Sequence, residues 1–203
     1  MKPDACYGDK EMTMKIKHSR ILSTTAFALL SLSGVAQADG GHCSNATIRG
    51  AYGFHGHGEI LGLLDSNNKL HPFASPSTLD DVAIVTFDGS GKFTRTDFGM
   101  INGLPKGGQT AFNPYQSGTY TVNSDCTGIM KVVYGSGGPV PAGVETDLQI
   151  VVSDDGTLIE SVVYKAYSPS SGPTADGTTC PPNCDQGVQE QFEGKKVLIY
   201  GFR

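Results

Sequence analysis

The sequence predicts an all-β protein, most simply an eight-stranded antiparallel up-and-down barrel. Apolar and polar residues alternate with period two over most of the chain after residue 46, and clusters of Gly, Asn, Asp and Pro divide it into short segments. No segment shows the spacing of an amphipathic helix. An antiparallel sheet of this size must hide its edges, and closure into a barrel does so. A two-sheet β-sandwich is the alternative for the same strands.

Residues 1–38 are predicted to be a leader that is removed. A basic segment at 15–20 precedes the apolar stretch Ile21–Val35, and Ala36-Gln37-Ala38 supplies the small residues that a signal peptidase recognises. The apolar stretch is shorter than the roughly 20 residues that span a bilayer. We therefore expect a single domain over 39–203, secreted or periplasmic, with no membrane attachment after cleavage.

The charge of the predicted mature chain argues against nucleic acid as a partner. It has 10 Lys and Arg against 17 Asp and Glu, and the basic residues are scattered. No basic stripe is available to follow a phosphate backbone.

Four cysteines remain once Cys6 leaves with the leader, and an even number in an exported chain predicts two disulfides. Four cysteines allow three pairings. Cys180 and Cys184 flank two prolines that can turn the chain, and their pairing leaves Cys43 with Cys126. Zinc is the alternative for Cys180 and Cys184, but it needs two more ligands, and no matching pair stands nearby in the sequence.

The first predicted strand covers 46–60. Successive side chains of a strand point to opposite faces, so Tyr52 and Phe54 share one face while His55, His57 and Glu59 share the other. Four glycines in this strand indicate a bend or the close approach of another group.

Two hairpins follow. Gly89-Ser90-Gly91 supplies the positive-φ residues of a tight turn between strands predicted over 79–88 and 92–102. The segment Ser117–Tyr134 predicts two strands joined by the turn Asn123-Ser124-Asp125.

The remaining strands are predicted over 143–153, 157–167 and 188–202. Three long loops complete the chain, and the first of them, at 61–78, has a length that is often functional. They are expected at 61–78, 103–114 and 168–187.

Three motifs resemble a family of small exported bacterial proteins that are similar to the allene oxide cyclase-like barrels, a fold that dirigent proteins share. The motifs are Cys43-x-x-Ala46-Thr47 leading to Gly50-x-Tyr52, Thr86-Phe87-Asp88-Gly89-x-Gly91, and Gly118-Thr119-Tyr120-x-Val122-x-x-Asp125-Cys126-x-Gly128. The resemblance implies an eight-stranded barrel and a Cys43–Cys126 disulfide. It transfers no catalytic residue, because no position here matches the active-site motif of the cyclases.

His55, His57 and Glu59 form a candidate metal site, since two imidazoles and a carboxylate on one side of a strand suit a divalent transition metal such as zinc, copper or iron. The alternative is that this face meets solvent, which the apolar Tyr52 and Phe54 on the opposite face favour. No other cofactor is expected.

Aromatic side chains inside the barrel form a candidate ligand-binding site, with phenol hydroxyls as its polar points. The alternative is that they fill a dry core. The primary set is Tyr52, Phe54, Phe87, Tyr120 and Tyr134, and the wider set adds Phe93, Tyr164 and Tyr200.

These observations favour a protein that binds a small apolar ligand, or a partner, without catalysis. A cyclase- or isomerase-type enzyme acting on a small hydrophobic substrate is one alternative, and a metal-binding protein is another. No Gly-x-Ser-x-Gly nucleophile motif precedes a helix, and no catalytic residue is assigned. A deep cavity holding an isolated Glu or Tyr with a perturbed pKa would favour the enzyme.

Overall fold

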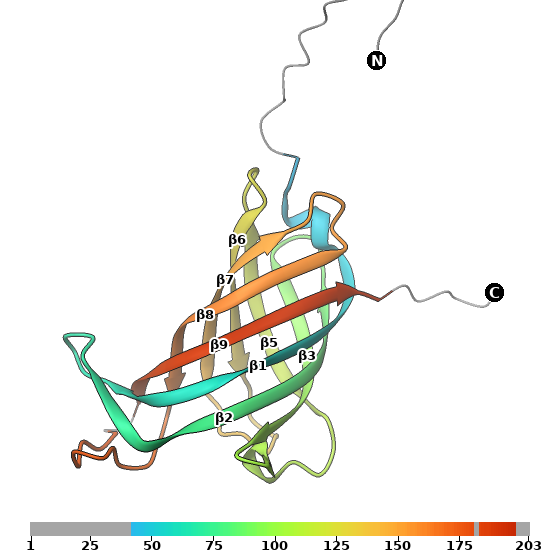
Figure 1. Ribbon diagram of the computed structural model, residues 1–203. Helices are drawn as coiled ribbons and strands as arrows, with labels where there is room; N and C mark the ends of the chain where they lie inside the picture. Colours follow the sequence, from blue (N-terminus) through green and yellow to red (C-terminus); the bar gives the residue numbers. More distant parts are fainter. Residues whose placement is uncertain (1–41, 181–182, 198–203) are drawn as a thin grey trace, which may run out of the picture. The chain divides into compact units, whose positions relative to one another are not determined.

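The computed structural model describes residues 42–180 and 183–197, which form a closed antiparallel β-barrel (Figure 1). No α-helix occurs among these residues. The predicted leader lies outside them. In chain order the elements are η1 (Asn45–Ile48, a 3-10 helix), β1 (Gly50–Leu64), β2 (Leu70–Phe87), β3 (Lys92–Ile101), β4 (Leu104–Pro105), η2 (Lys106–Gly108, a 3-10 helix), β5 (Asn113–Val122), β6 (Thr127–Tyr134), β7 (Glu145–Val152), β8 (Leu158–Ser168) and β9 (Cys184–Lys196).

The barrel closes by pairing its strands in chain order. Each long strand is antiparallel to the next, β9 pairs with β1, and β2 pairs with β3. The short β4 pairs with the end of β3 alone. The predicted eight-stranded up-and-down barrel is therefore confirmed with one extra short strand, and the sandwich alternative is wrong.

The predicted loop 61–78 is wrong, because β1 continues to Leu64 and β2 begins at Leu70. Pro72 and Pro76, which suggested a loop, lie within β2. The β2–β3 ladder starts only at Leu79. Pro72 pairs with Gly62 of β1 alone, and Pro76 lies in the irregularity between the pairs Gly62–Pro72 and Ile60–Ser77. Proline is tolerated where a strand has a free edge.

Other boundaries shift by smaller amounts. The first strand starts at Gly50 rather than at residue 46, because η1 occupies the start of the predicted range. The predicted loop 103–114 contains β4 and η2. The last strand starts at Cys184, earlier than predicted, and residues 198–202 of the predicted range lie outside the described residues.

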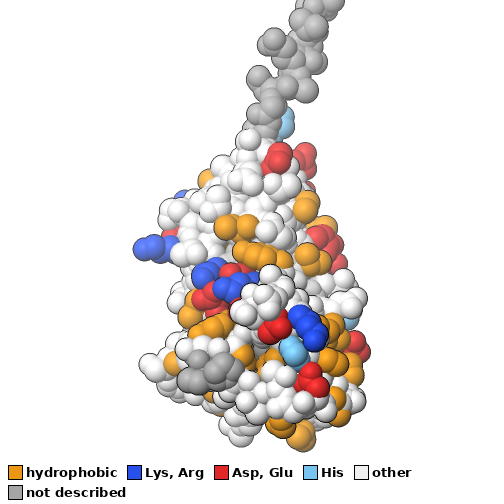
Figure 2. Space-filling view, turned by 90° about the vertical axis from the view of Figure 1, so that its left-hand side faces the viewer, with side chains coloured by type: hydrophobic (Ala, Val, Ile, Leu, Met, Phe, Trp, Pro, Cys, Tyr) orange, Lys and Arg blue, Asp and Glu red, His pale blue; other side chains and the backbone are white. Residues whose placement is uncertain are grey.

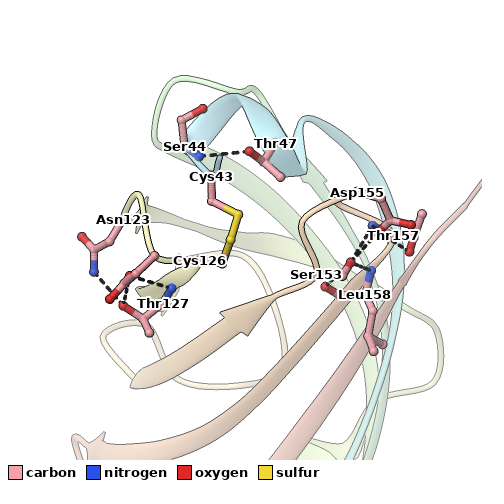
Figure 3. The surroundings of a disulfide bond; sticks show 11 residues. Cys43, Ser44, Thr47, Asn123, Cys126, Thr127, Ser153, Asp155, Thr157 and Leu158 are labelled. Carbon is pink, nitrogen blue, oxygen red and sulfur yellow. Dashed lines mark hydrogen bonds between the residues drawn. A yellow bond between two sulfur atoms is a disulfide. The ribbon is translucent and has the colours of Figure 1, made fainter. Parts of the chain in front are cut away.

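One end of the barrel, which we call the closed end, is covered by η1 and the turns at 88–91, 123–126 and 153–157. The Asn45 amide oxygen accepts a hydrogen bond from the backbone N–H of Val122 (2.7 Å). The Cys43–Cys126 disulfide, predicted from the sequence, joins the chain before η1 to one of these turns (Figure 3). The side chain of Ile48 is fully buried beneath this cap.

Aromatic rings fill the barrel below the cap. Phe87 lies against the rings of Tyr52, Phe93 and Tyr120, with ring centroids 4.9 to 5.5 Å apart. The Tyr52 hydroxyl donates to the carbonyl of Gly156, and the Tyr120 hydroxyl donates to the carbonyl of Asn45 (3.1 Å). These two phenols are therefore part of the packed core at the closed end, where each hydroxyl donates a hydrogen bond to a backbone carbonyl.

Candidate functional site

The opposite end, which we call the open end, carries the connections at 65–69, 102–112 and 135–144 and the described part of the connection from β8 to β9, residues 169–180 and 183 (Figure 1). Inside it lies a cavity of about 290 Å³. Its walls are mostly apolar. They include Phe54, Ile60, Leu79, Val85, Ile101, Met130, Val132, Val140, Leu148, Ala166 and Phe192.

A compact cluster of buried charges lines one part of this cavity. It contains two cations and two carboxylates: Arg95 and Asp97 from β3, Asp81 from β2, and Lys106 from η2. All four side chains are at most 12% exposed, and that of Asp97 is 0% exposed. The four charges balance, as buried ions require.

The contacts within the cluster are short and direct. Lys106 Nζ lies 2.7 Å from Asp81 Oδ2 and 2.5 Å from Asp97 Oδ2. The Arg95 guanidinium donates to Asp81 and to Asp97 Oδ2, the latter at 2.8 Å. The Tyr134 hydroxyl donates to Asp97 Oδ2 (2.7 Å) and accepts from Lys106 (2.7 Å). Lys106 thereby ties the loop after β4 to the barrel wall.

Amide side chains complete the surroundings of Asp97. Gln116 Nε2 donates to Asp97 Oδ1 (2.6 Å), and Gln109 Nε2 donates to the Asp97 carbonyl (3.2 Å). Gly99 faces the same interior, and a Cβ at this position would lie 2.9 Å from Lys106 Nζ and 3.0 Å from Asp81 Oδ2. Glycine here leaves the room that the ion pair needs.

Burial and charge act on these groups in opposite directions. Burial opposes ionisation of Asp97, but Arg95 and Lys106 outweigh it and hold the pKa of that carboxyl well below its usual range. Burial raises the pKa of Tyr134 although the two cations lower it. The phenol therefore stays neutral and serves as a hydrogen-bonding group.

Glu190 also lines the cavity and lies outside this cluster. Burial raises its pKa to about 7, with Lys106 acting against the rise and Asp81 adding to it. Among the described residues, no hydrogen bond or ion pair reaches its carboxyl group. An uncompensated carboxyl in a concave, mostly apolar site is typical of functional sites.

The predicted ligand-binding aromatics divide between the two ends. Phe54 and Tyr134 line the cavity, and their role in ligand binding stays a prediction. Tyr52, Phe87 and Tyr120 instead pack in the closed end, as in the dry-core alternative.

None of the three residues in the wider aromatic set is found lining the cavity in the described part of the chain. Phe93 packs with the closed-end aromatics, as the dry-core alternative requires. Tyr164 is wrong as an interior residue, because it lies on the outer face of β8 and is 54% exposed. Tyr200 lies outside the described residues.

The candidate metal ligands His55, His57 and Glu59 lie exposed on the outer face of β1. His57 Nε2 contacts the amide of Gln191 (3.1 Å) on the neighbouring strand. In the ranges that the structure describes, no three His, Cys, Asp or Glu side chains gather in a way that could hold a metal ion. The solvent-facing alternative for this strand face agrees with that placement.

The rest of the outer face is mixed in character. Figure 2 shows the side from which the β1–β2 hairpin projects, where hydrophobic side chains lie among acidic and basic ones. Exposed apolar residues such as Val151 and Val162 are spread over β7 and β8. The interior cavity is therefore the better candidate site.

His71 of β2 contacts the loop that follows β8 at the open end. His71 Nδ1 lies 2.7 Å from Asp176 Oδ2 and 3.1 Å from Thr178 Oγ1, and its Nε2 lies 3.4 Å from Asp65 Oδ2. Thr178 and Asp176 meet the same ring nitrogen, so this is not the relay of a nucleophile, a base and an orienting acid. The hydrogen bonds to Asp176 and Asp65 raise the pKa of His71, and the contacts with Asp176 and Thr178 hold this part of the loop against β2.

The charged cluster and Glu190 were missed by reasoning from the sequence. A signal existed for three of them, since Asp81, Arg95 and Asp97 share the inward phase of Phe87 and Phe93 on their strands. A charged residue in an apolar phase marks a buried polar site.

Both predicted disulfides are present, Cys43–Cys126 and Cys180–Cys184, and they are compatible with an oxidising compartment. Within the described ranges, no helix is long and apolar enough to cross a membrane. Comparison with protein-family models, with curated proteins and with solved structures found no match to this chain.

Proposed function

We propose that this protein is exported and binds a small, mainly apolar molecule in the cavity at the open end of its barrel. The observation that carries the proposal is the cavity itself, about 290 Å³ with mostly apolar walls and a few polar groups at one side. This combination is characteristic of small-molecule sites, and the volume is close to the lower limit of about 300 Å³ for them. Export is supported by the leader pattern and by the two disulfides.

The two ends of the barrel support a binding role. The closed end is filled by packed rings, so an apolar ligand would enter from the open end, where loops surround the cavity. The resemblance to the allene oxide cyclase-like barrels remains part of this proposal, because its motifs describe turns and a disulfide rather than the cavity. Fold alone does not establish function.

A cavity-filling substitution tests the proposal. Val132 on β6 lines the cavity, whereas Ile129 on the same strand is 48% exposed on the outside. Fluorescence titration with phenylnaphthylamine, an apolar dye, should show saturable one-to-one binding to the wild type. Val132→Phe should weaken it about tenfold or more because the ring occupies ligand space, and Ile129→Phe should leave it unchanged.

Absence of saturable binding, or equal binding by Val132→Phe with its fold intact by circular dichroism, would reject the cavity as the site. Native mass spectrometry of the protein purified from its own host would then identify the class of the natural ligand from any added organic mass that is lost on denaturation.

Proton transfer within the same cavity is a second candidate function, and Glu190 favours it. A carboxyl whose pKa lies near 7 can both give and take a proton at neutral pH. Base-promoted ring opening of nitrobenzisoxazole probes this property directly. A saturable rate that Glu190→Gln abolishes would support an isomerase-type enzyme, and a rate unaffected by the substitution would leave the binding role alone.

A further inference from the structure

The charges that face the cavity are unevenly balanced. Arg95 and Lys106 are both occupied by Asp81 and Asp97 in direct contacts. Glu145 also lines the cavity, but its carboxylate pairs with Lys131 (2.6 Å) toward the outside. Glu190 has no such partner among the described residues.

The alternation of side chains along β9 directs the Glu190 side chain into the barrel. Along β9 the residues Glu190 and Phe192 line the cavity, while Gln189 and Gln191 between and beside them are exposed. Alternation along a strand requires this division. The Glu190 side chain is thus presented to the ligand space by a rigid element.

Glycines on the neighbouring strand make room for these side chains. Gly58 is the partner of Glu190 in the β1–β9 ladder, and a Cβ on Gly58 would lie 2.7 Å from Glu190 Cγ. A Cβ on Gly56 would lie 2.0 Å from the ring of Phe192. Gly56 and Gly58 therefore leave room for the inward side chains of β9. This is the close approach of another group that the glycines of this strand indicated in the sequence.

We propose that the cavity selects an apolar molecule that carries one protonated amine, and that the Glu190 carboxylate pairs with that amine. This inference rests on the proposed binding function and names its ligand class. A cation completes the charge balance of the cavity, because the two resident cations are already neutralised. An anionic ligand would instead add a second uncompensated negative charge beside Glu190 and Asp81, which a low-dielectric site disfavours.

The groups that act on Glu190 set the pH dependence. Lys106 favours its ionised form and Asp81 disfavours it, while Arg95 and Tyr134 line the same cavity and are engaged with Asp97. His57, Glu59 and Asp80 line a second hollow, to which Glu190 also contributes. An amine remains protonated from pH 6 to pH 9, so its binding should strengthen as Glu190 ionises within that range.

Three eight-carbon probes of equal length test the proposal: octylamine, octanol and octanoate. Isothermal titration calorimetry at pH 8 should show octylamine binding about tenfold or more tightly than octanol, with octanoate the weakest. At pH 6 the advantage of octylamine should shrink, and its binding should release a proton, detected as a dependence of the measured enthalpy on the buffer. Glu190→Gln should abolish the advantage of octylamine and leave octanol binding unchanged.

Glu193→Gln is the matched control, because Glu193 lies on the same strand but pairs with Lys195 (2.7 Å). It should behave as the wild type with all three probes. Equal binding of octylamine and octanol would overturn the amine proposal while leaving the binding function standing, and tightest binding of octanoate would assign the ligand's polar group to Lys106 and Arg95 instead. Failure of all three probes to bind, together with failure of phenylnaphthylamine, would reject both proposals.

Discussion

The interior of the barrel is filled differently at its closed end and at its open end. At the closed end, aromatic rings fill the space, phenol hydroxyls meet backbone carbonyls, and a disulfide joins Cys43 to Cys126. At the open end, the space holds balanced charges, a cavity, and the Glu190 carboxyl, which has no direct hydrogen-bond or ion-pair partner among the described residues.

This difference indicates that the closed end stabilises the fold and the open end carries the function. Buried ion pairs contribute little net stability compared with apolar residues of similar volume, and a buried carboxyl without a partner costs free energy. The open end is therefore arranged at the expense of stability, which is the pattern of a functional site. The closed end supplies the stability that allows it.

The disulfides give the largest test of this division. Cys43 and Cys126 are separated by 83 positions, whereas Cys180 and Cys184 are separated by 4. In the chain-entropy model the first disulfide contributes about 4.5 kcal/mol and the second about 2 kcal/mol. We expect the double Cys→Ser variants to differ by that margin in the free energy of unfolding, measured in guanidinium chloride. Equal losses in the two variants would contradict a closed end that dominates stability.

A smaller effect, of opposite sign, is expected at Glu190. Below pH 4.5, the ordinary value of its pKa, the carboxyl is protonated in both the folded and the unfolded chain. Between pH 4.5 and 7 the unfolded chain ionises while the folded one keeps its proton, so the wild type loses stability as the pH rises. The loss levels off above pH 7 at about 3 kcal/mol.

Glu190→Gln removes this cost, so the variant should be more stable than the wild type at pH 8 and similar to it at pH 4. Urea unfolding at the two pH values measures the difference. Glu193→Gln provides the comparison, because hydrogen bonding to Lys195 lowers the pKa of Glu193 and its replacement should bring no gain. A Glu190→Gln variant that is no more stable at pH 8 would mean that the carboxyl has a partner in the folded chain.

The same two ends also differ in how far the sequence predicts them. The closed end depends on local chemistry, such as the turn Gly89-Ser90-Gly91 and the cysteine after Asp125, and the motifs of the family resemblance fall there. These features act within a few residues of one another, so a single sequence displays them.

The site at the open end forms only when strands that are distant in sequence pair to close the barrel. Asp81 and Arg95 could have been recognised as charges in an apolar phase, but which charges meet follows from the pairing of β2 with β3. Lys106 comes from an irregular loop with no periodicity to place it. Glu190 fell within the predicted strand 188–202, but it could be assigned to the interior only once the phase of β9 was known.

The outer face of β1 provides the smallest expected effect. His55 and His57 are exposed on the barrel wall, and the interior contacts of this strand come from Tyr52 and Phe54. Replacing both histidines with Ala should therefore change the free energy of unfolding by no more than about 0.5 kcal/mol, the range typical of surface positions. Zinc, copper and iron content, measured by mass spectrometry on protein prepared without chelator, should be equal in the variant and the wild type. A metal lost from the variant, with a fall in melting temperature, would show that Glu59 and these histidines form a site with a group from another molecule or from outside the described residues. That result would move the functional site from the barrel cavity to its outer wall.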